Sequence, residues 1–142
     1  MQLVEPYLFF EGRCEEALAF YEKAIGAKVQ AKMRYSESPE GNGGCPQGMP
    51  PGTENKIMHA LFKVGDASVM ASDGMNSGKP DFKGVSLALS MDDEAGVKKA
   101  FGALGEGGKV MQPLIKTFFS PAFGMVTDKF GVNWMVLVYK PM

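Results

Sequence analysis

The sequence contains a single histidine, His59, within the segment KIMHALFKVGDASVMASDG that spans residues 56–74. An imidazole can move protons near neutral pH, bind a metal ion, or donate one hydrogen bond while accepting another. A histidine that stands alone on a strand is more often a structural residue than a catalyst. Three interpretations of His59 stay open here: a structural residue, a ligand-binding residue of a pocket, and a catalyst.

The two cysteines, Cys14 and Cys45, are the other candidate reactive groups. Cys14 lies at a predicted helix start, where a lowered pKa would make its thiol reactive, but no second histidine is present to form a thiolate–imidazole pair. A reducing compartment favours free thiols over a disulfide. We therefore expect both cysteines to be free and structural or incidental, with a reactive Cys14 as the alternative.

The segment around His59 has the pattern of a β-hairpin whose turn is Gly65 and Asp66. Glycine at the first turn position suits the tight two-residue turns that match strand twist. This turn fixes which residues lie opposite one another. The expected opposite pairs are Val64 with Ala67, Leu61 with Met70, and His59 with Ser72.

The same register divides the hairpin into two faces, because side chains alternate along a strand. The uniformly apolar face should pack under a helix, and it carries Met58, Ala60, Phe62, Val64, Ala67, Val69 and Ala71. The mixed face has the character of a ligand-facing surface, with His59 hydrogen-bonded to Ser72, and it carries Ile57, His59, Leu61, Lys63, Ser68, Met70 and Ser72.

The elements before this hairpin follow from hydrophobic periodicity. EPYLFFEG is typical of a strand, RCEEALAFYEKAIG of a helix that stops at Gly26, and AKVQAKMRYSE of a half-buried strand. Residues 38–55 are too rich in glycine and proline for a helix or strand. A loop of this length is either a lid or binding loop, or a tolerated insertion.

The second half of the chain repeats the first. Residues 85–110 overlay PYLFFEGRCEEALAFYEKAIGAKV at an offset near 80, and two further strand patterns follow. Each half therefore has the order strand, helix, strand, strand, strand. We expect an α+β fold in one domain, built from two modules at about 1–75 and 82–142.

The composition limits the classes of partner. The chain has 142 residues, 15 basic and 16 acidic, and a net charge of −1, which gives no electrostatic footprint for nucleic acid. The start MQLVEPYLFF has no signal-peptide pattern, and no apolar run reaches the length of a membrane helix. We expect a cytoplasmic protein whose partners are small molecules or proteins.

The aromatic residues of the second half form another candidate surface. Phe118, Phe119, Phe123 and Trp134 are either core or the wall of a cavity. Together with the mixed face of the hairpin, they complete the set of ligand-binding residues that we predict: His59, Leu61, Met70, Ser72, Phe118 and Trp134.

The duplicated unit resembles a known superfamily. Three segments show the resemblance: ALAFYEKAIGAKV in the first half, ASVMASDG at the end of that half, and VTDKFGVNWMV near the carboxyl end. These resemble the vicinal oxygen chelate superfamily of glyoxalase, bleomycin-resistance and extradiol dioxygenase proteins, in its PhnB-like branch, often labelled 3-demethylubiquinone-9 3-methyltransferase-like. The resemblance implies two βαβββ modules, curled mixed sheets around a cavity with helices on the outer face, and a homodimer.

The metal enzymes of that superfamily hold a divalent ion with side chains from the first and last strands of the modules. Carried over to this chain, those positions offer one good ligand, Glu5, where imidazoles and carboxylates are required. We therefore expect no bound metal or other cofactor, with a divalent ion held by Glu5 and His59 as the weaker alternative. The positions carried over are the range 5–7, Met70 or Ser72, Ser86, and Met135.

Three functions follow from the resemblance and the residues. The first is metal-free binding of a small, partly apolar molecule, and the second is a metal-dependent glyoxalase-like lyase, isomerase or dioxygenase with an atypical ligand set. The third is an interaction module that kept the fold and lost the site. Methyl transfer is disfavoured, because neither EGNGG nor GEGG lies between a strand and a helix as a nucleotide-type glycine-rich turn does.

Overall fold

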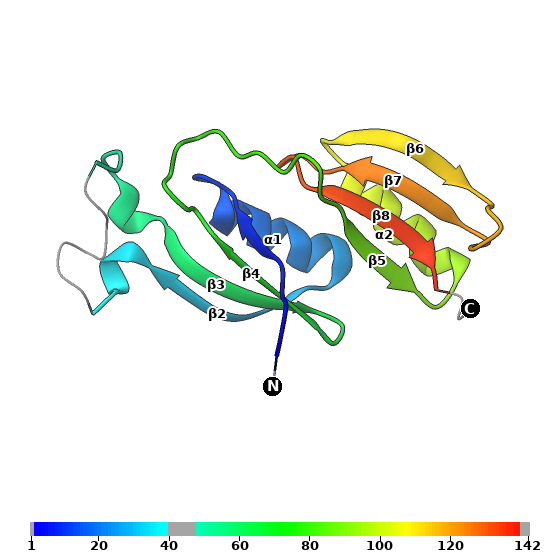
Figure 1. Ribbon diagram of the computed structural model, residues 1–142, viewed down its shortest axis with the longest axis horizontal. Helices are drawn as coiled ribbons and strands as arrows, with labels where there is room; N and C mark the ends of the chain where they lie inside the picture. Colours follow the sequence, from blue (N-terminus) through cyan, green and yellow to red (C-terminus); the bar gives the residue numbers. More distant parts are fainter. Residues whose placement is uncertain (1, 40–47, 140–142) are drawn as a thin grey trace. The chain divides into compact units, whose positions relative to one another are not determined.

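The computed structural model describes residues 2–39 and 48–139, and it divides into two compact units, Met1–Pro80 and Asp81–Met142 (Figure 1). Each unit contains one four-stranded sheet and one α-helix. Part of the predicted loop at 38–55, including Cys45, lies outside the described residues. No helix in the described part of the chain is both long and apolar enough to cross a membrane.

The first unit has the order strand, helix, strand, strand, strand. Its sheet is mixed: β1 runs parallel to β4, whereas β4, β3 and β2 pair antiparallel in that spatial order. Two short 3-10 helices, Tyr35–Glu37 and Thr53–Asn55, flank the part of the chain that is not described. The principal elements are β1 (Tyr7–Phe9), α1 (Cys14–Ile25), β2 (Lys28–Arg34), β3 (Ile57–Val64) and β4 (Ala67–Ser72).

The second unit repeats this topology strand for strand. Its sheet order is β5-β8-β7-β6, and β5 is again parallel to the last strand of its unit. The predicted duplication and the α+β class are therefore confirmed. The elements are β5 (Leu87–Met91), α2 (Glu94–Gly105), β6 (Lys109–Ile115), β7 (Phe123–Thr127) and β8 (Asn133–Val138).

Helix α1 covers one face of the first sheet. Its residues Ala17, Leu18 and Tyr21 are buried, and the Tyr21 ring stacks on Phe62 of β3 with centroids 5.8 Å apart. The helix ends where the sequence predicts, because Gly26 adopts the left-handed conformation (φ 68°) that a non-glycine residue enters at a cost.

Helix α2 covers one face of the second sheet in the same way, and Figure 1 shows it behind the strands of that unit. Val97, Ala100 and Leu104 form its buried face. Gly124 of β7 permits close packing here, because a Cβ at this position would lie 2.6 Å from Cε2 of Phe101. Each sheet therefore has one face packed against its own helix, and we call the opposite face its open face.

The predicted hairpin is present, with one correction. Val64 lies opposite Ala67 and Leu61 opposite Met70, as the turn at residues 65–66 requires. At its other end β3 contains a register irregularity: Met33 pairs with His59 and Arg34 pairs with Ile57, which leaves Met58 as an extra residue.

This bulge reverses the alternation of side chains before His59. Ile57 is fully buried instead of sharing the face of His59, and Met58 lines a hollow with Tyr7 on the open face instead of packing under the helix. The predicted faces are therefore wrong at Ile57 and Met58. They are confirmed for the fully buried Ala60, Phe62 and Ala71.

Candidate functional site

His59 lies on the open face of the first sheet, next to Tyr7 of β1. The phenol oxygen of Tyr7 and Nδ1 of His59 are 3.1 Å apart, and the two ring centroids are 5.7 Å apart. The expected hydrogen bond from His59 to Ser72 is wrong, since the Ser72 hydroxyl oxygen instead accepts the backbone N–H of Gly74 at 3.0 Å. Parallel pairing of β1 with β4 places Tyr7 within reach of the histidine.

Aromatic and thioether side chains lie around Tyr7. The ring centroids of Phe9 and Tyr7 are 4.9 Å apart. Leu8 and Phe10 are buried on the helix side, so the alternation of side chains along the strand places Tyr7 and Phe9 on the open face. A hollow of about 460 Å³ opens here, which is the size range of small-molecule sites. It is lined by Tyr7, Phe9, Glu11, Tyr35, Met58, Ser72, Gly74 and Met75.

The other predicted ligand-binding residues of the first unit share this face. Leu61 and Met70 lie opposite each other, and Met70 also pairs with Tyr7 of the parallel strand β1. Ser72 lines the hollow directly. The structure thus brings His59, Leu61, Met70 and Ser72 onto one sheet surface.

The two predicted residues of the second unit lie in different environments. Phe118 is 97% exposed and contacts Phe119 edge-to-face in the segment between β6 and β7. Trp134 is 3% exposed, and its indole N–H donates to the Asp128 carboxylate at 2.9 Å. Phe118 therefore lines none of the hollows described here, and Trp134 is chiefly a core residue.

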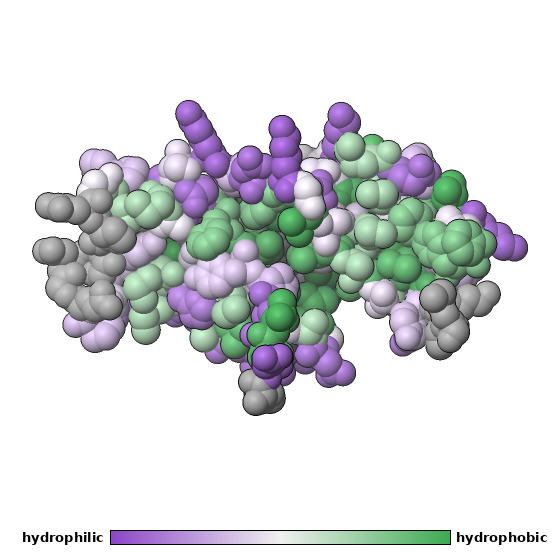
Figure 2. Space-filling model, viewed as in Figure 1, coloured by the Kyte–Doolittle hydropathy of each residue, from purple (hydrophilic) through white to green (hydrophobic). Residues whose placement is uncertain are grey.

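The second unit carries its own hollow of about 260 Å³. Figure 2 shows hydrophobic side chains gathered over β7 and β8 in this unit. Its apolar lining residues include Val85, Met111, Met125, Val126 and Trp134. This hollow has no imidazole and no carboxylate among its lining residues.

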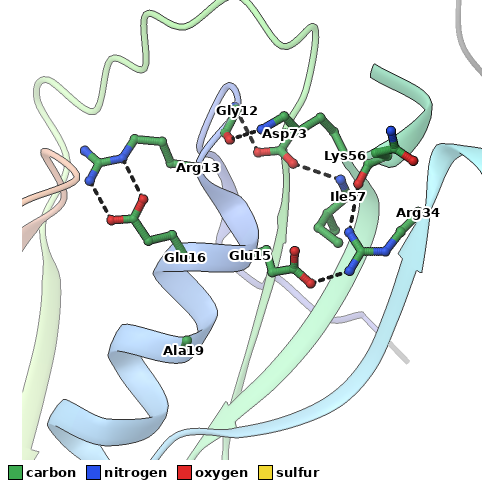
Figure 3. Close-up of a pocket in the computed structure, with 10 residues that line it drawn as sticks. Gly12, Arg13, Glu15, Glu16, Ala19, Arg34, Lys56, Ile57 and Asp73 are labelled. Carbon is green, nitrogen blue, oxygen red and sulfur yellow. Dashed lines mark hydrogen bonds and ion pairs between the residues drawn. The ribbon is translucent and has the colours of Figure 1, made fainter. Parts of the chain in front are cut away.

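A larger recess of about 600 Å³ lies at the start of α1, shown in Figure 3. Its charged groups satisfy one another: the Glu15 carboxylate accepts hydrogen bonds from Arg34 and Lys32. The Arg34 guanidinium beside Glu15 lowers the pKa of that carboxyl. Lys56 Nζ donates to the backbone carbonyl of Gly12 at 2.8 Å. This recess is an exposed ion-pair network, and its size does not indicate a ligand site.

Asp73 organises the floor of that recess. Its carboxylate is 1% exposed and accepts three backbone hydrogen bonds, from Gly12 at 2.9 Å, Cys14 at 2.8 Å and Ile57 at 2.8 Å. Asp73 therefore caps the start of α1 in place of Arg13, the residue at the cap position, which makes no side-chain cap hydrogen bond. The same carboxylate joins that helix to the first residue of β3.

Cys14 is a free and fully buried thiol. Burial raises its pKa far above the ordinary range, and the adjacent Asp73 carboxylate raises it further. The predicted free thiol is confirmed for Cys14, and the alternative of a reactive thiolate at a helix start is contradicted. Burial is the larger cause, and the Asp73 carboxylate acts in the same direction.

We expect Cys14 to be chemically silent in the native protein. In a Cys45→Ser variant, where Cys14 is the sole thiol, an aromatic disulfide reagent at about pH 8 should react on the order of a hundred times more slowly without urea than in urea, because reaction requires opening of the core. Absorbance of the released thiolate measures both rates. Equal rates would show that this thiol is accessible in the native fold.

The described residues do not fit a divalent metal at the positions implied by the resemblance. Within residues 2–39 and 48–139, no three side chains of histidine, cysteine, aspartate or glutamate are grouped as a metal site requires. Of the positions carried over, Tyr7 pairs with Met70 and Met135 pairs with Ala88, so a phenol and two thioethers stand at Tyr7, Met70 and Met135. Nδ1 of His59 faces Tyr7. Among the described residues, His59 and Glu5 do not belong to any cluster of three metal-binding side chains.

Known proteins match this chain over nearly its whole length. The sequence model of the 3-demethylubiquinone-9 3-methyltransferase family matches residues 2–137. Protein YjdN of Escherichia coli K12 is 37% identical over 141 residues, which cover 96% of this chain and 95% of that one.

Solved structures extend the comparison. PA1353 of Pseudomonas aeruginosa is 38% identical, with a TM-score of 0.82 over 99% of this chain and all of that one. The PhnB protein of Bacillus cereus is 27% identical, with a TM-score of 0.76 over 96% of this chain and 99% of that one.

More distant structures share the fold alone. A glyoxylase/bleomycin resistance protein/dioxygenase domain from Frankia is 11% identical, with a TM-score of 0.65 over 99% of this chain and 98% of that one. The two βαβββ units, the family match and the close relatives all lead to one assignment. The chain belongs to the 3-demethylubiquinone-9 3-methyltransferase family, and it shares its fold with a glyoxylase/bleomycin resistance protein/dioxygenase domain.

Proposed function

We propose that this protein binds a small, partly apolar molecule on the open face of its first sheet, without a metal ion. The observation that carries the proposal is the hollow of about 460 Å³, whose lining combines aromatic and thioether side chains with the phenol of Tyr7, and this phenol is hydrogen-bonded to the neighbouring His59. Ligand sites typically combine an apolar lining with a few polar groups that fix orientation. Sequestration of a small molecule, as in bleomycin-resistance proteins, is the corresponding activity.

A metal-dependent lyase, isomerase or dioxygenase is the competing function. It requires imidazole and carboxylate ligands with open coordination positions, and the donor set of the described residues does not supply them. Elemental analysis after dialysis against zinc, nickel, manganese and iron separates the two functions. One tightly held equivalent of metal per chain would favour the enzyme over the binder.

The proposal predicts where an apolar probe binds. With 2-acetylnaphthalene as the probe and methionine labelled with carbon-13 at its methyl group, the resonances of Met58 and Met75 should shift on titration, because both residues line the hollow. The Met111 resonance, which belongs to the second unit, is the internal reference. Saturable shifts confined to Met111, or no shifts at all, would refute binding at the first sheet.

His59→Ala should weaken probe binding and lower the free energy of unfolding by about 1 to 2 kcal/mol, the scale of one part-buried hydrogen bond with its packing. Urea denaturation measures the stability, and the probe titration measures the affinity. Lys63→Ala, an exposed change on the same strand, is the matched control and should alter neither. A loss above about 4 kcal/mol would identify His59 as a core residue.

We further propose that the protein is a homodimer. The family resemblance implies a pair, and the second unit exposes an apolar edge strand, with Val110 48%, Met111 56% and Ile115 46% exposed on β6. Light scattering at micromolar concentration should give twice the chain mass of 15.3 kDa. A monomer mass that persists on concentration would contradict the pairing.

A further inference from the structure

We infer that Tyr7 holds the neutral imidazole of His59 as the Nε2–H tautomer, so that the open face of the first sheet selects a flat apolar ligand carrying a neutral hydrogen-bond-accepting oxygen. The ligand class rests on the function proposed above, whereas the tautomer does not. Tyr7 acts here as a positioning residue, because it orients the ring that would contact the ligand.

The first step concerns the hydrogen bond between Tyr7 and His59. A neutral imidazole has one N–H donor and one acceptor nitrogen, and a phenol can take either role. The imidazole lone pair is a strong acceptor, whereas the phenol oxygen shares its electrons with the ring and is a strong donor. At 3.1 Å the favoured arrangement therefore has the Tyr7 O–H donating to Nδ1 of His59.

The second step follows from this direction. When Nδ1 accepts, the ring proton must lie on Nε2. Tyr7 is the sole hydrogen-bond partner of His59 among the described residues, and no buried side-chain nitrogen or oxygen there lacks a partner. Nε2 must therefore be accessible to solvent and able to donate one hydrogen bond to a ligand.

The third step sets the shape of the ligand. The rings of Phe9, Tyr7 and His59 form a continuous series, with centroids 4.9 Å and 5.7 Å apart and small interplanar angles of 31° and 38°. Thioethers of Met58 and Met75 line the hollow together with Tyr7 and Phe9, and His59 lies next to Tyr7 at its side. Aromatic rings and polarisable sulfur favour a flat, conjugated partner over a branched aliphatic one.

The fourth step sets the charge of the accepting oxygen. The carboxylate of Glu11 lines the hollow, where it accepts the backbone N–H of Ser77 at 3.1 Å. Among the residues that the structure describes, no lysine or arginine lines the hollow with it. A carboxylate or phosphate ligand would therefore meet repulsion. A ketone, aldehyde or ether oxygen suits the Nε2–H donor without that cost.

The tautomer can be tested without any ligand. Because the chain has one histidine, nitrogen-15 labelling of histidine gives one pair of ring resonances, recorded at about pH 8.5, where imidazoles are ordinarily neutral. We expect a protonated-type shift at Nε2 and an unprotonated-type shift at Nδ1. In Tyr7→Phe the two shifts should move toward the averaged values of free histidine. A protonated Nδ1 in the parent protein would overturn the assignment.

The ligand class is tested with two probes of nearly equal shape. 2-Acetylnaphthalene has one acceptor oxygen, and in 2-isopropenylnaphthalene a methylene group replaces that oxygen. We expect the ketone to bind about tenfold more tightly, the value of one hydrogen bond. His59→Phe should abolish this preference, and Tyr7→Phe should reduce it while thermal unfolding confirms that both variants fold.

The outcomes separate the two proposals. Equal affinity of the probes for the parent protein would overturn the acceptor requirement and leave the binding function standing. Failure of both probes to bind would overturn the binding function together with the ligand class. The tautomer would then be decided by the nitrogen resonances alone.

Discussion

Replacing Asp73 by asparagine is expected to lower the free energy of unfolding by about 3 to 4 kcal/mol, because a buried carboxylate that accepts several backbone N–H groups would lose part of its accepting capacity. One carboxylate oxygen accepts from Gly12 and Cys14, and the other accepts from Ile57. An asparagine amide keeps one accepting oxygen and turns its NH₂ group toward a backbone donor. At least one buried N–H is then unsatisfied.

Asp93→Asn is the matched control for this prediction. Asp93 caps α2 through a single exposed hydrogen bond from the backbone N–H of Gly96 at 2.8 Å. Asparagine is as good a cap as aspartate at such a position, so we expect a change within about 0.5 kcal/mol. Urea denaturation monitored by circular dichroism measures both variants. Similar losses for both would mean that burial of the Asp73 carboxylate has no special energetic role.

Gly108→Ala should destabilise the protein by about 2 to 4 kcal/mol, because an added methyl group would overlap the backbone of the second unit. A Cβ at Gly108 would lie 2.2 Å from the carbonyl oxygen of Thr127 and 2.9 Å from two backbone atoms of Asp128. These atoms belong to the end of β7 and the following turn and cannot rotate away as a side chain can. The start of β6 would have to move instead.

The same substitution at Gly102 provides the opposite expectation. Gly102 lies inside α2, and a Cβ there meets no atom within 4 Å. Alanine should therefore stabilise the helix by about 0.5 to 1 kcal/mol. Thermal and urea unfolding of the two variants, measured side by side, should shift in opposite directions. Loss of stability in Gly102→Ala would contradict the open space at this position of α2, and unchanged stability in Gly108→Ala would contradict the close packing at the start of β6.

Much of the fold could be predicted because its signals are local. The helix that ends at Gly26 and the turn at Gly65 and Asp66 each depend on a few neighbouring residues, and the structure confirms both. The duplication shows the order strand, helix, strand, strand, strand a second time, which supports the same prediction independently. Its confirmation in the strand orders of the two sheets explains why the α+β class followed from the sequence.

The candidate site was harder to predict because it depends on contacts between distant segments. The bulge at Met58 changes the face of Ile57 with no glycine or proline to mark it. Tyr7 becomes the partner of His59 only through the parallel pairing of β1 and β4, which a hairpin argument does not contain. The sequence signal for this face was the alternation of Tyr7 and Phe9 with the buried Leu8 and Phe10, which places both rings on the side of the sheet away from the helix.

The aromatic residues of the second unit show a further limit. Phe118 and Trp134 have similar hydrophobic character, yet one is almost wholly exposed and the other is buried against Asp128. Composition alone cannot separate a residue in a connecting segment from one on a central strand. The turn VTDKFGVNW held the relevant information, since Asp128 accepts from Phe130, Val132 and the indole of Trp134.

The parallel pairing of the first and last strands also has a consequence for the order in which each unit folds. The hairpin β3–β4 closes a two-residue turn, whereas β1 has three residues and pairs with β4 only across nearly the whole sequence of its unit. Closing the longer loop costs more chain entropy, so we expect the hairpin in the transition state and β1 to dock after it. Loss of the Asp73 hydrogen bonds to Gly12 and Cys14, which follow β1 in the chain, should then accelerate unfolding and leave the folding rate nearly unchanged.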